Sequence, residues 1–84
     1  MEYDINAVGA VIRQQRMKKK LTQEVLSGFA VIGRSHLSEI EHGHHHDFSL
    51  RTFWQIALAL DLRPSELMRL IEEETERRER EKEP

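Results

Sequence analysis

Five histidines are the side chains of this sequence best suited to bind a metal ion. They are His36, His42, His44, His45 and His46. Imidazole is a ligand of zinc and nickel, and Glu39 or Asp47 could add an oxygen ligand. However, consecutive loop histidines rarely face one point, and no C-x-x-C or H-E-x-x-H pattern sets a geometry. We therefore expect a polar loop that becomes cationic at acidic pH and then holds phosphate better, with no metal site.

Catalytic chemistry has little support in the sequence. The chain contains no cysteine and therefore no thiolate nucleophile. Ser35 and His36 are adjacent, but neighbouring residues of a helix face different directions and cannot form a catalytic triad. No glycine-rich phosphate loop is present, and 84 residues bury only a modest core. We expect neither enzyme activity nor a cofactor.

Charge is unevenly distributed along the chain. The formal net charge is −2, but residues 72–84 hold seven acidic and four basic residues, which leaves the first 71 residues at +1. This balance permits a DNA partner without requiring one. No apolar run approaches the roughly 18 residues of a membrane span, and the N-terminus lacks the basic-then-apolar order of a signal peptide. We expect a cytoplasmic protein with no membrane partner.

Hydrophobic spacing predicts a first helix that runs to about residue 19. Asp4 or Asn6 can cap it. Its apolar stripe follows spacings of three and four residues: Ile5, Val8 and Ile12. Gly9 costs about 1 kcal/mol relative to alanine inside a helix, which suggests that another helix passes close by. Arg16 follows four residues after Ile12 on the same inward stripe, so its charge needs a partner.

Residues 22–43 read as two short helices joined by a tight turn. Thr22 can cap the first helix, and Gly43 can end the second. No single straight helix keeps the apolar residues of this stretch on one face: Leu26, Ala30, Ile32, Leu37 and Ile40. A helix pair this short cannot bury itself, so the other segments must supply its core.

Two further helices follow a polar loop. Ser49 can cap a fourth helix, and Arg63 or Ser65 begins a fifth beside Pro64. Residues 72–84 contain no apolar side chain, so we expect a charged tail that is helical or disordered. The domain itself would then span residues 1–71.

The stretch of residues 22–43 resembles the phage-repressor and Cro-like (XRE-type) helix-turn-helix family. The resemblance is carried by Thr22, Gln23, Glu24, Leu26, Ala30, Ile32, Ser35, Leu37, Ser38, Ile40, Glu41 and Gly43. Flanking matches extend it over about residues 5–71. It implies an all-α, five-helix lambda-repressor-like DNA-binding domain with a charged C-terminal helical extension. Val31 departs from the pattern, because glycine usually holds this turn position and a β-branched residue is disfavoured at positive φ.

The resemblance implies that the second helix of the motif enters the major groove of DNA. Base-edge contacts would come from Gly33, Arg34, Ser35 and Glu39. Arg34 is the best reader among them, because a guanidinium reaches O6 and N7 of guanine together. Phosphate contacts would come from Gln23, His42, His44, His45, Arg51 and Lys20.

The resemblance also pairs Arg16 with Glu41 as a structural ion pair, which would satisfy the inward charge of Arg16. A single recognition helix covers only a few base pairs, so we expect a homodimer on double-stranded DNA. Four apolar residues are not needed to fill a four-helix core, and we expect them to form the dimer interface: Trp54, Met68, Leu70 and Ile71.

These features favour a transcriptional regulator, a repressor or controller of its own or a neighbouring operon. The alternative is a protein-interaction module, such as an antitoxin-like or adaptor subunit that binds a protein partner. The near-neutral domain and the acidic tail keep this alternative open. A specific DNA site whose affinity falls steeply with salt would separate the first function from the second.

Overall fold

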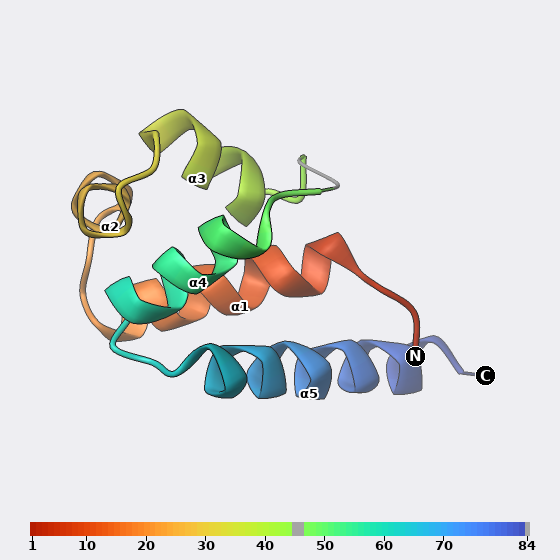
Figure 1. The fold of residues 1–84 in the computed structure, drawn as a ribbon. Coiled ribbons are helices and arrows are strands. Elements are labelled where there is room, and N and C mark those ends of the chain that lie inside the picture. The colour runs from red at the N-terminus through yellow and green to blue at the C-terminus, as the bar shows by residue number, and fades with distance from the viewer. Residues whose placement is uncertain (45–46, 84) are drawn as a thin grey trace.

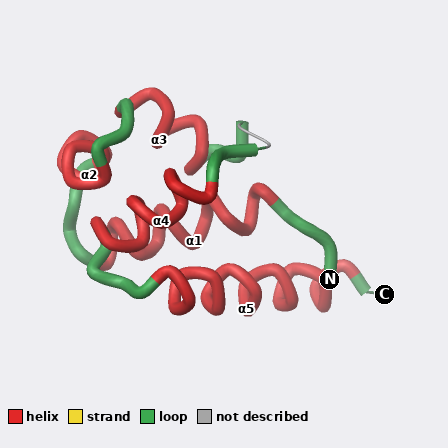
Figure 2. Tube along the Cα trace, viewed as in Figure 1, coloured by secondary structure: helices red, strands yellow, loops and turns green. Residues whose placement is uncertain are grey.

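The computed structural model describes residues 1–44 and 47–83, and this part of the chain forms five helices and no strand (Figures 1 and 2). The helices are α1 (Ile5–Lys18), α2 (Gln23–Ala30), α3 (Arg34–Glu41), α4 (Leu50–Ala59) and α5 (Pro64–Lys82). None of the described helices is both long enough and apolar enough to cross a membrane. The prediction of an all-α, five-helix fold is confirmed.

Helices α1, α2 and α4 begin where a side chain accepts a hydrogen bond from a free N–H group of the first turn. Asp4 Oδ1 accepts a hydrogen bond from the Asn6 N–H at 2.9 Å, so Asp4 is the residue that caps α1. Thr22 and Ser49 cap α2 and α4 through their hydroxyl oxygens, at 3.1 and 3.0 Å. Pro64 is the first residue of α5. Its lack of an N–H group costs no hydrogen bond there, because the N–H at this position has no partner within the helix. Local side-chain chemistry thus sets where these helices start.

A single hydrophobic core joins the helices. Its largest fully buried side chains are Ile12, Leu26, Leu37, Ile40, Ile56, Leu60 and Leu67. Helix α1 packs against α3 and against α5, while α2 packs against both α3 and α4 (Figure 1). Helix α3 therefore buries one face against α1 and α2 and turns its opposite face outward. Helix α5 lies on the other side of α1 from α3.

Helix α5 crosses the domain boundary expected at residue 71 without interruption. The tail is therefore helical through Lys82, which is one of the two alternatives that its composition allowed. Thr75 is buried within it, and its hydroxyl donates to the Ile71 carbonyl at 2.7 Å. Hydrogen bonds from Arg77 and Arg78 lower the pKa of the Glu74 carboxyl to about 2. The charged half of α5 thus continues the domain as an ordered helix.

Gly9 marks the closest approach of α1 to α3. A Cβ atom at this position would lie 2.7 Å from the carbonyl oxygen of Glu41 and closer still to that of Ile40. No real Cβ atom sits so near a backbone oxygen, and both oxygens belong to the end of α3. The glycine is therefore needed for the two helices to touch, as its place inside α1 suggested.

Gly9→Ala should lower the free energy of unfolding by about 1–3 kcal/mol, because α3 must move away from α1 to admit the methyl group. Gly28→Ala is the matched control, since Gly28 lies inside α2 and an added Cβ would meet nothing within 4 Å. That variant should gain up to about 1 kcal/mol from helix propensity. Urea unfolding followed by circular dichroism measures both. Equal or opposite effects would show that the close approach does not constrain the fold.

Candidate nucleic-acid interface

The turn between α2 and α3 depends on a left-handed residue that is not glycine. Val31 has φ 56° and ψ 47°. Its N–H donates to the Gly28 carbonyl at 3.2 Å, and the next N–H, of Ile32, donates to Ser27 at 3.0 Å. These two bonds end α2 in a Schellman-type cap. A β-branched residue in this conformation stores about 1–3 kcal/mol of strain, so the surrounding packing must hold the turn in place.

Helix α3 starts with weak local capping and an exposed face. Gly33 holds the N-cap position and offers no side-chain hydrogen bond. Arg34, Ser35 and Glu39 are exposed on the side that α1 and α2 leave free. Together with Gln23 and Ser38 they line a shallow groove of about 320 Å³. The structure therefore brings three of the four residues expected to read bases, all except Gly33, together with the first residue of α2.

A buried hydrogen-bonded network connects α1, α2 and α3. Arg16 Nε donates to Glu41 Oε2 at 2.7 Å, and Arg16 Nη2 donates to Glu41 Oε1 at 3.0 Å. The same Oε1 accepts a hydrogen bond from Gln23 Nε2 at 3.1 Å. Arg16 also donates to the carbonyl of Leu21 at 2.8 Å. The Glu41 side chain is 0% exposed, so the geometry is that of a buried, bidentate ion pair.

Gln23 therefore takes part both in the buried network and in the groove on the exposed face of α3. Its side-chain nitrogen carries two hydrogens, and Glu41 accepts one of them. Gln23 also lines the groove that Arg34 lines. The sequence alone predicts only a phosphate contact for Gln23. The geometry adds that Glu41 fixes the position of its amide.

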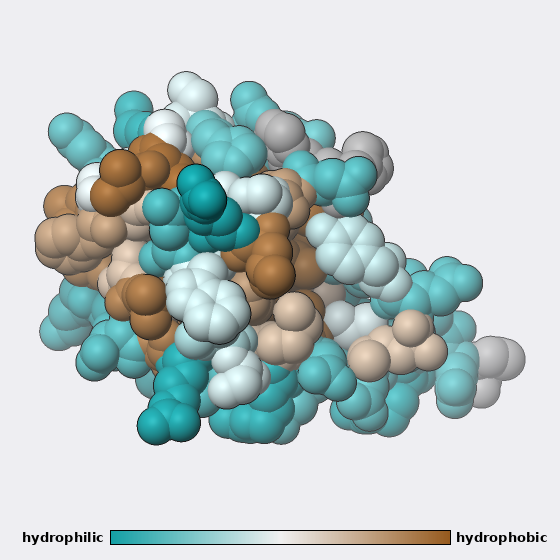
Figure 3. All heavy atoms as spheres, viewed as in Figure 1, coloured by the Kyte–Doolittle hydropathy of each residue, from teal (hydrophilic) through white to brown (hydrophobic). Residues whose placement is uncertain are grey.

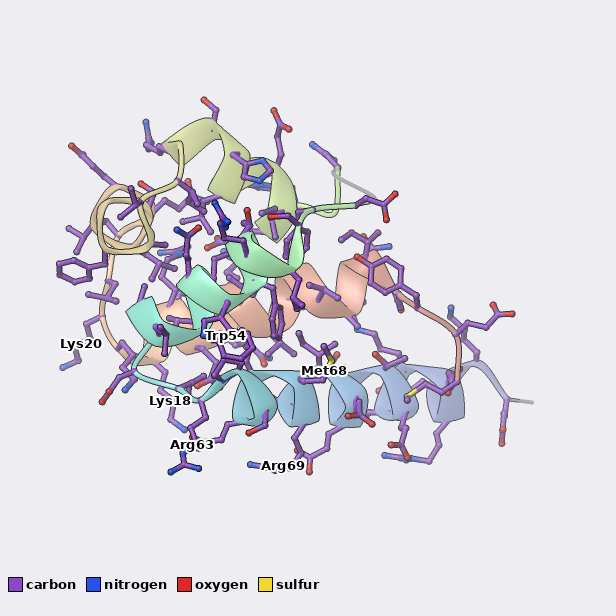
Figure 4. The ribbon with its side chains drawn as sticks, viewed as in Figure 1. Lys18, Lys20, Trp54, Arg63, Met68 and Arg69 are labelled. Atoms are coloured by element: carbon purple, nitrogen blue, oxygen red, sulfur yellow. The ribbon has the colours of Figure 1, made fainter. Side chains whose placement is uncertain are left out.

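The remaining residues expected at phosphates divide into two groups. His42 and His44 follow α3 with their rings stacked 5.7 Å apart, and Arg51 is exposed in the first turn of α4. His45 lies outside the described residues, as does His46. Lys20 is different, because it points away from α3 at the α1–α2 turn, near Lys18 (Figure 4). The structure therefore places Lys20 away from the groove face, apart from the other residues expected at phosphates.

An exposed apolar surface lies over α4 and the middle of α5 (Figure 3). Trp54 is 51% exposed and Met68 is 43% exposed, but Ile71 is 7% exposed and belongs to the core, and Leu70 is half-buried. Ile71 follows Leu67 by one helical turn and therefore faces inward with it. Ile71 is therefore a core residue that also lines the apolar groove beside Met68.

Leu50 and Tyr3 add to this exposed surface, at 68% and 66% exposed, and sequence reasoning had not selected them. With Met68 and Phe53 they border an apolar groove of about 270 Å³. Partial burial, and then the nearby Asp47 carboxylate, raise the pKa of Tyr3. Within the described residues, no group of three acidic, histidine or cysteine side chains is placed to hold a metal ion.

A short helix, a left-handed turn and a second helix with an outward face define a helix-turn-helix domain. A sequence model described as "Helix-turn-helix" matches residues 12–67. The chain belongs to this family, and its XRE-type resemblance is confirmed. A search of curated proteins found no match.

Solved structures similar to this chain include three regulators. The restriction-modification controller protein C.AhdI from Aeromonas hydrophila is 34% identical, with a TM-score of 0.73 over 76% of this chain and 96% of that one. The biofilm regulator SinR in complex with DNA is 26% identical, with a TM-score of 0.68 over 73% and 97% of the two chains. The C.Esp1396I controller tetramer bound to its 35 base-pair operator is 22% identical, with a TM-score of 0.78 over 88% and 96%, and shows the fold alone.

Glu41→Ala should lower the free energy of unfolding by about 3–5 kcal/mol, because it leaves the Arg16 guanidinium buried without its charge partner. Glu73→Ala is the matched control, since Glu73 pairs with Arg69 on the surface of α5 and should change stability by less than about 1 kcal/mol. Thermal and urea unfolding measure both variants. Similar losses in the two would contradict a special role for the buried pair.

Proposed function

We propose that this protein is a sequence-specific, double-stranded DNA-binding regulator of transcription that acts as a dimer. The observation that supports this most directly is the shared groove of Gln23, Arg34, Ser35 and Glu39 on the exposed face of a helix-turn-helix domain. The first 71 residues carry a net charge of +1, so local contacts rather than a general positive field must provide DNA affinity. We place its action in the cytoplasm, as a repressor or controller without enzyme activity.

Each element of the interface has a separate role in this proposal. Helix α3 enters the major groove with its N-terminus first, which brings Gly33 near the groove floor and Arg34 to a guanine edge. Ser35 accepts or donates at a neighbouring base, and Glu39 accepts from a cytosine amine. The start of α2 at Gln23 holds a phosphate on one side of the groove.

The phosphate on the other side would be held by residues that follow α3. His42 and His44 lie directly after it, and Arg51 is exposed in the first turn of α4. His45 belongs to the same segment of the sequence. These contacts position α3 but carry no base sequence information. The proposal that this domain binds DNA is supported by SinR, which was solved in complex with DNA.

Arg34→Ala should weaken binding to a preferred duplex by about tenfold to a hundredfold, which corresponds to one bidentate guanine contact. The duplex is selected from a random-sequence pool, and affinity is measured by fluorescence anisotropy. Arg80→Ala is the control, because it removes the same charge from α5, on the far side of α1 from α3. Binding to an unselected duplex should fall much less in the Arg34 variant.

Two results would count against this assignment. Equal weakening on selected and unselected duplexes would make Arg34 a phosphate contact rather than a base reader. A pool that yields no preferred duplex at any salt concentration would favour the protein-interaction module instead.

The apolar surface over α4 and α5 is the interface that we propose for the dimer. Met68→Glu should give a folded monomer, with the dimer dissociation constant raised about tenfold or more. Val25→Glu is the control, since Val25 is 42% exposed, much like Met68, but lies on α2. Trp54 is the only tryptophan, so its emission should shift to shorter wavelength as the wild-type dimer forms. An unshifted spectrum and equal dissociation constants would contradict this interface.

A further inference from the structure

Four glutamates continue the edge of α5 that carries Met68. They are Glu72, Glu76, Glu79 and Glu83, and all are exposed. From Met68 onward the spacings are four, four, three and four residues. The first three glutamates lie within α5 and Glu83 caps it, and this spacing places all four on one side of the helix. We call these four residues the acidic stripe. It begins where the apolar surface of Met68 ends.

Bases of α5 do not neutralise the acidic stripe. The ion pairs of this helix within the described residues use other acids: Glu73 with Arg69, Glu74 with Arg77 and Arg78, and Glu81 with Arg77. Glu79 accepts only a long hydrogen bond from the Glu2 N–H, at 3.4 Å. Lys82 borders the stripe without an ion pair to it in the described part of the chain. The stripe is therefore a row of carboxylates that face solvent.

Unpaired bases gather at the opposite end of the domain. Lys18, Lys20 and Arg63 come from the end of α1, the following turn and the residue before α5, and all three lie on the side away from α3 (Figure 4). We call these three the basic cluster. None of them forms an ion pair within the described residues, whereas the neighbouring Lys19 lies 4.0 Å from Asp61. In Figure 4, Trp54 and Met68 lie between the basic cluster and the far end of α5.

We propose that the acidic stripe of one copy docks on the basic cluster of a second copy, with the two α5 helices antiparallel. This inference rests on the proposed dimer and adds its register and its salt dependence. A two-fold axis perpendicular to α5, passing beside the helix at the level of Leu70, places the first half of one α5 against the second half of the other. At about 1.5 Å per residue, Glu79 lies about 13 Å from that point and Arg63 about 10 Å in the opposite direction.

The apolar and charged parts of this surface have different effects. Trp54 and Met68 lie at the centre, where buried apolar area supplies most of the affinity. The contacts between the acidic stripe and the basic cluster lie at the rim, and the two-fold symmetry forms them twice. They therefore select the antiparallel register and exclude a parallel one, which would align like charges. Because rim charges remain hydrated, salt should weaken the dimer measurably.

Charge reversal on both sides tests this arrangement. Glu76→Lys with Glu79→Lys reverses the stripe, and Lys18→Glu with Lys20→Glu reverses the cluster. Each pair should raise the dimer dissociation constant about tenfold or more at about 0.05 M salt, and the four changes together should return it to within about threefold of wild type. The differences should shrink strongly at about 0.5 M salt. Sedimentation equilibrium and Trp54 emission measure the constant, and circular dichroism checks folding.

Glu73→Lys with Glu81→Lys is the matched control. It makes the same charge change on the same helix, but these residues lie on the side of α5 opposite Met68. A stripe variant that behaves like this control, or a fourfold variant that stays as weak as either pair, overturns the docking and leaves the dimer intact. A wild-type protein that is monomeric at every concentration overturns the dimer and this inference together, while Arg34-dependent DNA reading would stand.

Discussion

The burial of one carboxylate, that of Glu41, determines how the recognition helix sits on the domain. Glu41 is the last residue of α3, and its side chain is fully enclosed. A buried charge is stable only if partners satisfy it, and here the partners come from α1 and α2 through Arg16 and Gln23. Three short helices that have little stability alone are thus held in one relative orientation. Any change in that orientation would leave a charge unpaired.

The glycines near α3 make this network geometrically feasible. Gly9 lets the backbone of α1 touch the end of α3, and Gly43 takes a φ of 71° directly over the side chain of Asn6. Both contacts bring the end of α3 onto α1, which is the end that carries Glu41. The beginning of α3 is held less firmly, by the strained Val31 turn and an N-cap without a side-chain bond. Helix α3 is therefore held most firmly at its C-terminal end, while its N-terminal end lies beside the groove that Arg34 lines.

The sequence is informative where structure depends on local rules and less so where it depends on packing between helices. The caps at Thr22 and Ser49 follow from residue type, and the inward position of Arg16 follows from helical period. The direction of Lys20 does not, because it depends on the path of the α1–α2 turn, where this residue has φ 59°. The inward position of Thr75 was equally hidden, since the charged half of α5 has no apolar stripe to show it.

The net charge of this chain says little about its partners, because opposite charges are separated along one helix. Within the described residues, the start of α5 lies beside bases that form no ion pair and its end carries acids that form none, and the proposed docking rests on this separation of charge. A near-neutral domain binds DNA weakly as a single copy, and pairing two copies multiplies that affinity through effective concentration. Salt then weakens two linked equilibria, the dimer contact and the phosphate contacts. Near the dimer dissociation constant, DNA binding should therefore depend on salt more steeply than phosphate contacts alone would require.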